Sequence, residues 1–312
     1  MTNKHRKEYT LGTRLKKDLR KNWVLYIMLI PVLAYFIVFH YWPMYGVTLA
    51  FKDYKTKLGI LGSPWIGFDN FERFFSAYNF KNLLQNTITL SIYSLLIGFP
   101  IPIIFALCLN YLTKNKLKKT VQMVSYMPHF ISTVILCGML QIFCSPRNGA
   151  FNVLLNLLGF DSINFLGKAD YFKHIYVWSG VWQDMGWSAI IYISALSGVD
   201  YEMHEAAIID GASKIQRMRY IDIPSITSTI VMLFIMKLGS LMSVGFEKVY
   251  LLQNDLNVSK SQIISTYVYE IGLLDRNFSY STAVSLFNTV INIILLVTSN
   301  AVCKKLTKES LF

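Results

Sequence analysis

The clearest catalytic pattern in the chain is one polar stretch, His204-Glu205-Ala206-Ala207-Ile208. This stretch is similar to the His-Glu-x-x-His motif of zinc hydrolases. That motif places two histidines one helical turn apart, with a glutamate beside the first, so that both rings reach the metal. Isoleucine occupies the second histidine position here. The metal would lose a ligand, and we therefore do not expect a zinc enzyme.

Other catalytic patterns are also missing from the sequence. No Gly-x-x-x-x-Gly-Lys-Ser/Thr loop, the phosphate cradle of many ATPases, occurs in the chain. No serine nucleophile with histidine and aspartate partners is recognisable, and the four cysteines lack metal-ligand or redox spacing. The sequence predicts a protein that is not an enzyme and holds no metal or cofactor of its own. If ATP drives it, another chain binds the nucleotide.

Two charged residues stand inside long apolar stretches. Asp184 interrupts residues 174–199, and Lys237 interrupts residues 223–246. A charge inside a bilayer is costly, and it usually faces a cavity or an opposite charge. The function of both residues therefore depends on whether these stretches cross a membrane.

The composition argues for a membrane protein. Charged residues make up 15% of the chain and hydrophobic residues 54%, whereas a typical soluble domain carries about 25% charged residues. Runs without Asp, Glu, Lys or Arg that exceed the roughly 20 residues needed to cross a bilayer occupy 22–51, 82–113, 120–146 and 277–303. Together with the two interrupted stretches, they predict an all-α polytopic membrane protein with six transmembrane helices, at 23–43, 83–112, 121–144, 174–197, 225–246 and 281–302.

The positive charge predicts the orientation of the chain. The net charge is +12, and Lys and Arg are densest in 1–22, in 114–119, in 198–223 and in the C-terminal tail. All of these segments are cytoplasmic if both ends of the chain are cytoplasmic, and positive charge resists translocation. We therefore expect an N-in and C-in protein with a basic N-terminal segment and a retained membrane anchor. The charge requires no nucleic-acid partner.

The loop between the fourth and fifth spans carries the strongest local signals. Asp200 is a good helix N-cap and Gly211 a natural C-terminal stop, which predicts a short helix between them. Ser213 and Gln216 have capping-box spacing, which predicts a second helix. Pro224 suits the first turn of the fifth span, where its missing N–H costs least.

This predicted pair of helices has two interpretations. A stripe of small residues, Ala206, Ala207 and Gly211, would let another chain approach closely. Alternatively, the second helix, with Lys214 and Arg217, could rest on lipid headgroups as a basic amphipathic helix.

The spacing in this loop resembles the signature of type I ATP-binding-cassette import permeases. That signature reads Glu-Ala-Ala, three residues, Gly, nine residues, Ile-x-Leu-Pro, and this chain matches it with Glu205, Ala206, Ala207, Gly211, Ile221 and Pro224. Ile223 replaces the usual leucine and keeps its apolar character. The resemblance implies the MetI-like permease fold. It divides the chain into the N-terminal segment 1–22, a first transmembrane helix and extracellular loop at 23–81, a core permease domain at 82–303 containing the coupling loop 198–224, and a cytoplasmic tail at 304–312.

Four more stretches are similar to carbohydrate permeases for complex oligosaccharides, the LplB-type group that serves aldouronate or rhamnogalacturonan fragments. They are Tyr41-Trp42-Pro43-Met44-Tyr45-Gly46, Gly59-Ile60-Leu61-Gly62-Ser63-Pro64-Trp65-Ile66-Gly67, Pro128-His129-Phe130-Ile131-Ser132 and Thr266-Tyr267-Val268-Tyr269-Glu270. The similarity runs through nearly the whole chain.

This resemblance implies the partners of the protein. In such importers a second permease chain completes the pathway, two ATPase subunits bind ATP and Mg, and an extracellular solute-binding protein delivers the sugar. The helix from Glu205 to Gly211 would enter a cleft of the ATPase as a coupling helix, and Glu205 would meet a basic or amide group there. The implied site of action is a bacterial plasma membrane, and the implied substrate is an oligosaccharide, with an acidic pectin or xylan fragment as one case.

Polar and aromatic residues in the spans are candidates for the substrate pathway. Aromatic rings stack on sugar faces, polar side chains bind hydroxyls, and Lys237 could be the counter-ion of an acidic sugar. The candidates are Trp182, Gln183, Asp184, Trp187, Lys237 and Asn288. Alternatively, Lys237 pairs with Asp184 or with a carboxylate of the partner permease, and Asn288 makes interhelical hydrogen bonds.

Two other function classes stay open at this point. The chain could be the permease of an importer for another class of substrate. An ion-coupled secondary transporter is less favoured, because it would need more spans, inverted repeats and a complete ion site in one chain. The long outer loops at 52–82, 145–173 and 247–280 could dock the binding protein.

Overall fold

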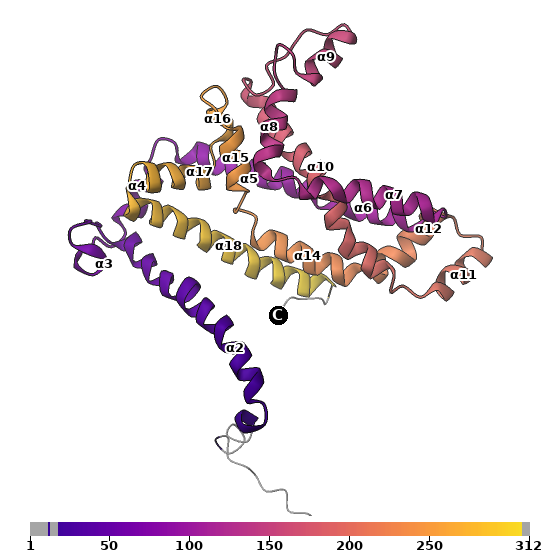
Figure 1. Ribbon diagram of the computed structural model, residues 1–312, viewed down its shortest axis with the longest axis horizontal. Helices are drawn as coiled ribbons and strands as arrows, with labels where there is room; N and C mark the ends of the chain where they lie inside the picture. Colours follow the sequence, from indigo (N-terminus) through magenta and orange to yellow (C-terminus); the bar gives the residue numbers. More distant parts are fainter. Residues whose placement is uncertain (1–11, 13–17, 308–312) are drawn as a thin grey trace, which may run out of the picture.

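The computed structural model describes residue 12 and residues 18–307. Most of the predicted segments 1–22 and 304–312 therefore lies outside the described residues. The described part is helical throughout, apart from loops and one isolated antiparallel bridge between Lys52 and Trp65. Figure 1 shows a bundle of long helices from which α2 projects at one end.

Three helices in the described part are long and apolar enough to cross a membrane, and they match the predicted first, second and sixth spans. The first, Trp23–Phe51, comprises α2 (Trp23–Phe36), a π turn (Ile37–Tyr41) and a 3-10 helix (Trp42–Phe51). The second, Phe80–Asn110, comprises α5 (Phe80–Gly98) and α6 (Pro100–Asn110), and the third lies in α18 (Phe278–Thr307). The protein therefore has several apolar helical spans.

The predicted third span is not one straight helix. α7 (Asn115–Tyr126) and the 3-10 turn Met127–Phe130 are bent by 97° relative to α8 (Thr133–Phe143). Pro128 lies in the turn and lacks the N–H that would continue the helix. The Ser132 side chain then accepts a hydrogen bond from the Ile135 N–H and so caps a new helix. The prediction of a continuous helix over 121–144 is wrong for this reason.

The predicted fifth span begins at a bend, close to where it was predicted to start, but it ends early. The helix formed by α12 (Lys214–Arg217), a π turn (Met218–Asp222) and α13 (Ile223–Ser225) is bent by 65° relative to α14 (Thr227–Gly239). The predicted range of 225–246 is therefore too long at its C-terminal end, because the helix stops at Gly239. If each bent pair is one span, the described residues contain up to five apolar spans.

α10 (Ala169–Leu196) covers the predicted fourth span but is not among these apolar spans, so five of the six predicted spans are matched at most. It forms the centre of the bundle, where it packs against α5, α6 and α7 (Figure 1). Its contact with α7 is very close at Gly186. A Cβ atom at Gly186 would lie 2.2 Å from the carbonyl oxygen of Ser125. Only glycine fits between these two backbones.

We expect Gly186→Ala to destabilise the protein by about 1–3 kcal/mol, because the methyl group would force α10 away from α7. The measurement is thermal unfolding of the detergent-solubilised protein. Gly138→Ala is the matched control, since Gly138 also lies inside a helix, α8, but has open space around its Cβ position. Equal stability of the two variants would contradict the close contact.

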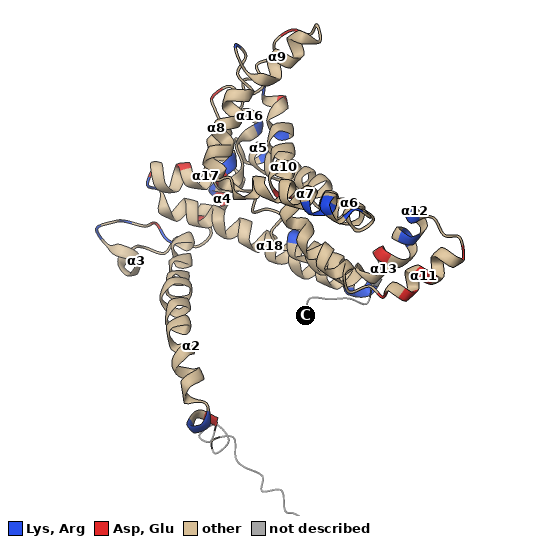
Figure 2. Ribbon diagram, turned by 45° about the vertical axis from the view of Figure 1, so that its right-hand side comes forward, with Lys and Arg blue, Asp and Glu red and all other residues tan. Residues whose placement is uncertain are grey.

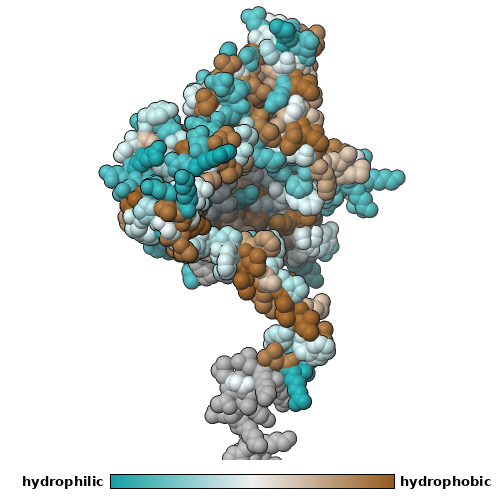
Figure 3. Space-filling model, turned by 60° about the vertical axis from the view of Figure 1, so that its left-hand side comes forward, coloured by the Kyte–Doolittle hydropathy of each residue, from teal (hydrophilic) through white to brown (hydrophobic). Residues whose placement is uncertain are grey.

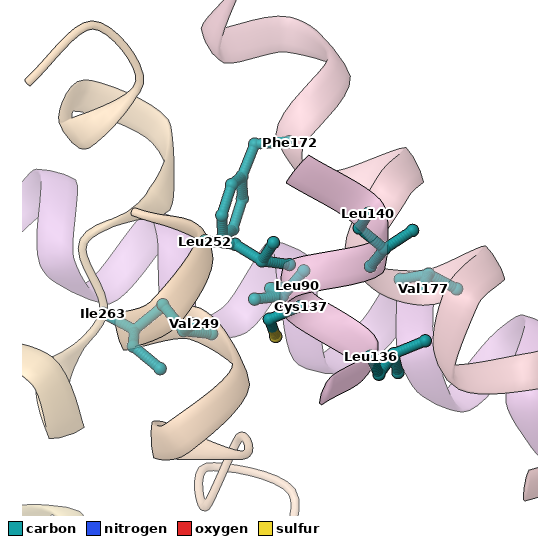
Figure 4. Close-up of a cluster of buried hydrophobic side chains, with 9 residues drawn as sticks. All are labelled: Leu90, Leu136, Cys137, Leu140, Phe172, Val177, Val249, Leu252 and Ile263. Carbon is teal, nitrogen blue, oxygen red and sulfur yellow. The ribbon is translucent and has the colours of Figure 1, made fainter. Parts of the chain in front are cut away.

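The main core joins helices that are distant in the sequence. Figure 4 shows nine buried side chains from α5, α8, α10, α15 (Phe246–Leu252) and the residue that precedes α17 (Ile264–Tyr269). They are Leu90, Leu136, Cys137, Leu140, Phe172, Val177, Val249, Leu252 and Ile263. This cluster holds α15 against the central helix α10.

The remaining helices are short, and α2 stands apart. The short helices are α3 (Gly59–Gly62), α4 (Asp69–Phe75), α9 (Ala150–Leu157), α11 (Tyr201–Ile209), α16 (Val258–Ser261) and the π turn Glu270–Leu274. No residue of α2 is buried, and Figure 3 shows this helix as a hydrophobic rod clear of the other described helices. A helix that is apolar on every side belongs in lipid or against another membrane helix.

Candidate coupling loop and transport pathway

The caps predicted for the loop after α10 are present in the structure. The Asp200 carboxylate accepts a hydrogen bond from the Glu202 N–H at 3.0 Å and begins α11. The Ser213 hydroxyl accepts a hydrogen bond from the Gln216 N–H at 3.3 Å, while the Gln216 side chain accepts one from the Ser213 N–H at 2.7 Å. This capping box begins α12, and the predicted pair of short helices is confirmed.

Gly211 ends α11 with a left-handed backbone, at a φ of 78°. The Gly211 N–H donates to the Ile208 carbonyl at 3.0 Å, and the Ala212 N–H donates to the Ala207 carbonyl at 2.8 Å. These two bonds form a Schellman motif, which satisfies the last carbonyl groups of the helix. A Cβ at Gly211 would meet no described atom within 4 Å. The glycine is therefore required by the turn and not by packing inside this chain.

The small residues and Glu205 face outward. Glu205, Ala206 and Gly211 are exposed and Ala207 is partly exposed, so another chain can reach them. Large apolar side chains flank them, with Ile209 at 85% and Ile215 at 77% exposure. Figure 2 shows acidic residues on α11 beside basic residues on α12, at the far end of the molecule from α4 and α17. The surface formed by α11 and α12 is thus both apolar and charged.

The last two signature residues have different environments. Ile221 is buried, as a residue that packs the second helix onto the bundle should be. Pro224 is exposed and does not begin the fifth span as predicted. It lies in α13, between the π turn and the 65° bend, so it belongs to the helix before the break. A proline is tolerated there because the regular hydrogen-bond ladder is already interrupted.

Two of the predicted pathway residues meet at the bend between α7 and α8. The Asp184 carboxylate lies 2.8 Å from Nδ1 of His129. The His129 ring stacks on Trp187, with centroids 4.5 Å apart and planes 7° apart, and Phe130 meets Trp187 edge-on at 5.7 Å. Both Asp184 and Trp187 are also exposed. This polar and aromatic group is open to a ligand.

Gln183 and Trp182 have other neighbours. The Gln183 amide donates a hydrogen bond to the Ile131 carbonyl at 2.8 Å and so supports the backbone of the bend. Trp182 is 46% exposed, and the structure does not join it to the His129 group. Sequence reasoning missed the part played by His129, although the histidine stands inside the Pro128–Ser132 stretch.

Lys237 does not pair with Asp184. Lys237 is exposed in the last turn of α14, whereas Asp184 contacts His129 instead. The alternative that Lys237 and Asp184 hold this chain in register is therefore wrong. A pairing of Lys237 with a carboxylate on another chain stays a prediction.

Asn288 makes an interhelical contact. Its amide donates to the Met242 carbonyl at 3.4 Å, and Asn292, one turn later, accepts a hydrogen bond from the Met242 N–H at 2.9 Å. These bonds attach the segment after α14 to α18. The alternative of interhelical hydrogen bonding thus describes Asn288 in this structure. Its side-chain oxygen, Oδ1, is buried without a hydrogen-bond partner among the described residues.

Lys248 is the buried cation that the sequence reasoning did not identify. It is 8% exposed, its Nζ donates to the Tyr176 carbonyl at 2.9 Å, and it lies 4.9 Å from the centre of the Tyr176 ring. A Cβ on Gly180 would lie 3.3 Å from Nζ, so the ammonium group contacts the face of α10 that also carries Asp184, one turn further on. Because the predicted fifth span ends at residue 246, where α15 begins, Lys248 was assigned to an outer loop.

The environment of Lys248 disfavours its charge. Burial lowers the pKa of its ammonium group to about 8, against a smaller opposite effect of Cys137 and Asp184. No carboxylate forms an ion pair with Lys248 among the described residues. A buried cation with only a carbonyl and an aromatic ring as neighbours is able to bind an anion.

Comparisons with known proteins agree with this architecture. Residues 74–308 match the family described as binding-protein-dependent transport system inner membrane component. Protein LplB of Bacillus subtilis (strain 168) is 44% identical over 96% of this chain and 92% of its own length. The polygalacturonan/rhamnogalacturonan transport system permease protein YteP of the same strain is 41% identical over 96% of this chain and 93% of its own length.

A solved structure has the same fold. The crystal structure of a bacterial alginate transporter, in complex with a periplasmic protein bound to an alginate pentasaccharide, contains a chain that is 36% identical. The TM-score is 0.89, over 96% of this chain and all of the other. With the family match over most of its length, this chain belongs to the inner-membrane permease components of binding-protein-dependent ATP-binding-cassette transporters and is a multi-pass membrane protein, not an enzyme.

Proposed function

We propose that this chain is the permease subunit of an ATP-driven importer of acidic oligosaccharides. The observation that carries the proposal is similarity over nearly the whole chain to two permeases whose names or titles give acidic glycans, polygalacturonan or rhamnogalacturonan in one case and alginate in the other. The buried Lys248 supports it, because a carboxylated sugar would supply the anion that this lysine lacks.

The proposed partners follow from this function. A second permease chain forms the other half of the pathway, and two ATPase subunits bind ATP and Mg on the cytoplasmic side. An extracellular solute-binding protein delivers the oligosaccharide. The basic segments at 114–119 and 198–223 support an N-in and C-in orientation, in which α11 and α12 face the cytoplasm.

We place the ATPase contact on α11. The accessible residues of this helix are Glu205, Ala206, Ala207 and Gly211. The Schellman turn at Gly211 pairs the last carbonyl groups of the helix inside this chain. Ile221 and Pro224 act indirectly, by placing the second helix against the bundle. ATP binding would draw the coupling helices of the two permeases together and rock the spans between two states.

We place the substrate pathway beside the face of α10 that carries the exposed residues Asp184 and Trp187. Trp187 offers an exposed ring for stacking on a sugar, while Asp184 and His129 offer hydrogen bonds to hydroxyls. Trp182, Gln183, Lys237 and Asn288 remain candidates for the same pathway. To them we add Lys248 as the counter-ion of a sugar carboxylate.

The proposal is tested with the complete importer in lipid vesicles. We expect ATP-dependent uptake of alginate pentasaccharide or of oligogalacturonides, and no uptake of a neutral maltooligosaccharide of equal length. Uptake of the neutral sugar alone would assign another substrate class. Uptake by this chain alone under an ion gradient would show that the protein is a secondary transporter and not an importer subunit.

Uptake is also expected to depend on pH through Lys248. Its pKa of about 8 lies below the usual lysine value, so the counter-ion is charged below that pH and is lost as the pH rises through it. With the binding protein saturated, the uptake rate of an acidic oligosaccharide should fall as the pH passes 8. Lys248→Arg should keep the rate high, because a guanidinium group stays charged. An identical alkaline fall in both proteins would contradict this role.

A further inference from the structure

The helix α11 is attached to the rest of the protein by one buried side chain. His204 is its only buried residue, while residues on the other faces, such as Tyr201 and Ile209, are mostly exposed. The helix therefore has no apolar core contact that would hold it rigidly. Any force on α11 must pass through its two chain connections or through His204.

His204 contacts a fully buried carboxylate. Its Nε2 lies 3.2 Å from Oδ1 of Asp222, whose side chain is 0% exposed, although the pair lacks hydrogen-bond geometry. The other carboxylate oxygen, Oδ2, accepts a hydrogen bond from the Tyr111 hydroxyl at 2.7 Å. One carboxylate thus connects α11, the π turn Met218–Asp222 and the residue that follows α6.

Tyr111 has further contacts that fix its position. Arg217 lies over its ring, with Cζ 5.4 Å from the ring centre, and the His204 ring meets it at 6.4 Å. Burial, and then the hydrogen bond to Asp222, raise the pKa of the Tyr111 hydroxyl, so it stays protonated and donates. Two side chains, His204 and Tyr111, therefore contact a buried carboxylate that would be very unfavourable without them, and Arg217 packs on the Tyr111 ring.

The position of Asp222 in the chain is equally informative. It is the last residue of the π turn, and the helix that contains it ends in the 65° bend before α14. Tyr111 directly follows the long span Phe80–Asn110. The Asp222 carboxylate therefore lies between α11 and the ends of two membrane helices, α6 and α14.

We propose that Asp222 is a positioning residue that fastens α11 to these two helices, so that displacement of α11 moves the ends of α6 and α14 together. The inference rests on the proposed docking of the ATPase on α11. His204 joins the carboxylate to α11, and Tyr111 joins it to α6. Breaking the connection leaves the exposed docking surface intact but lets α11 move without the spans.

The test uses the reconstituted importer with Asp222→Asn, His204→Gln and the double variant. We expect the ATPase to co-purify normally and ATP hydrolysis to continue, while alginate pentasaccharide uptake per ATP falls about fivefold or more. The double variant should be no worse than Asp222→Asn alone, because both changes break one connection. Amide hydrogen exchange of α11 in the complex should increase in all three.

A matched pair of residues provides the control. Tyr26 donates a hydrogen bond to Asp18 at 2.6 Å, the same chemistry as in Tyr111 and Asp222, but at an exposed site beside α2. Asp18→Asn should leave uptake per ATP and α11 exchange unchanged. If Asp222→Asn does not fold, Tyr111→Phe, which removes one hydroxyl, should lower uptake per ATP, and Tyr26→Phe should not.

Unchanged uptake per ATP, or unchanged exchange of α11, in correctly assembled Asp222→Asn or Tyr111→Phe complexes would overturn the inference. Strictly additive losses in the double variant would also overturn it. If the unsubstituted complex carries no acidic glycan, the proposed function fails instead, and hydrogen exchange still tests the attachment of α11. Loss of the ATPase from these variants would show that Asp222 serves docking and not transmission, which contradicts the inference.

Discussion

Replacing Gly211 with valine is expected to abolish oligosaccharide uptake while the chain remains in the membrane. The φ of 78° at Gly211 is unfavourable for any β-branched residue, at a cost of about 1–3 kcal/mol. The cost falls on the Schellman turn that ends α11, where an added Cβ would meet no described atom within 4 Å. The measurements are uptake in vesicles, the amount of the chain in the membrane fraction and the amount of ATPase that co-purifies.

A second substitution at the same position separates conformation from space. Asparagine tolerates the left-handed region, so Gly211→Asn should preserve the turn while adding a side chain to the docking surface. If Gly211→Asn transports and Gly211→Val does not, the turn is what matters. If both fail and both lose the ATPase, the space above Gly211 is needed as well. Normal uptake by Gly211→Val would remove the coupling assignment.

The second large effect is expected at Lys248. Lys248→Met should lower uptake of an acidic oligosaccharide about tenfold or more, since the loss of one partner of a buried charge pair costs about 2–5 kcal/mol. Methionine loses the hydrogen bond and the cation–π contact with Tyr176 but keeps most of the volume, and the Tyr176 carbonyl still accepts a hydrogen bond from the Ser179 hydroxyl, so the helices α10 and α15 should stay packed. The initial rate of uptake with a saturated binding protein is the measurement, and ATPase co-purification reports assembly.

Two other lysines complete this experiment. Lys119→Met removes an exposed positive charge from the basic segment 114–119 and should not change the rate. Lys237→Met tests the counter-ion that the sequence indicated. A wild-type rate in Lys248→Met together with a large loss in Lys237→Met would return the role to Lys237.

Local signals predicted the coupling loop well. Asp200, Gly211, Ser213 and Gln216 act through bonds to backbone groups at most five residues away, so their spacing alone specifies the caps. The long apolar spans were predicted for a similar reason, because a bilayer imposes a minimum length. The breaks at Pro128 and after Gly239 were missed, because composition records how apolar a stretch is but not its direction.

Non-local contacts explain what was missed at the candidate sites. His204 attracted attention as half of a zinc motif, but its partner is Asp222, and the carboxylate is completed by Tyr111, 111 residues earlier in the chain. One of the open alternatives paired Asp184 with Lys237, yet Asp184 meets His129, 55 residues earlier. Nothing in the local pattern around either residue specifies such a partner.

The sequence by itself determined the membrane class, the helical composition and the caps of the coupling loop, because bilayer thickness and backbone hydrogen bonding act over one helix or one turn. Only the tertiary structure decided which charges are buried and which groups face them. The sequence placed Lys237 inside a span and Lys248 in an outer loop, but Lys237 is exposed in the last turn of α14 and Lys248 is buried against α10. The cost of a buried charge depends on every neighbour that excludes water, and those neighbours come from distant parts of the chain.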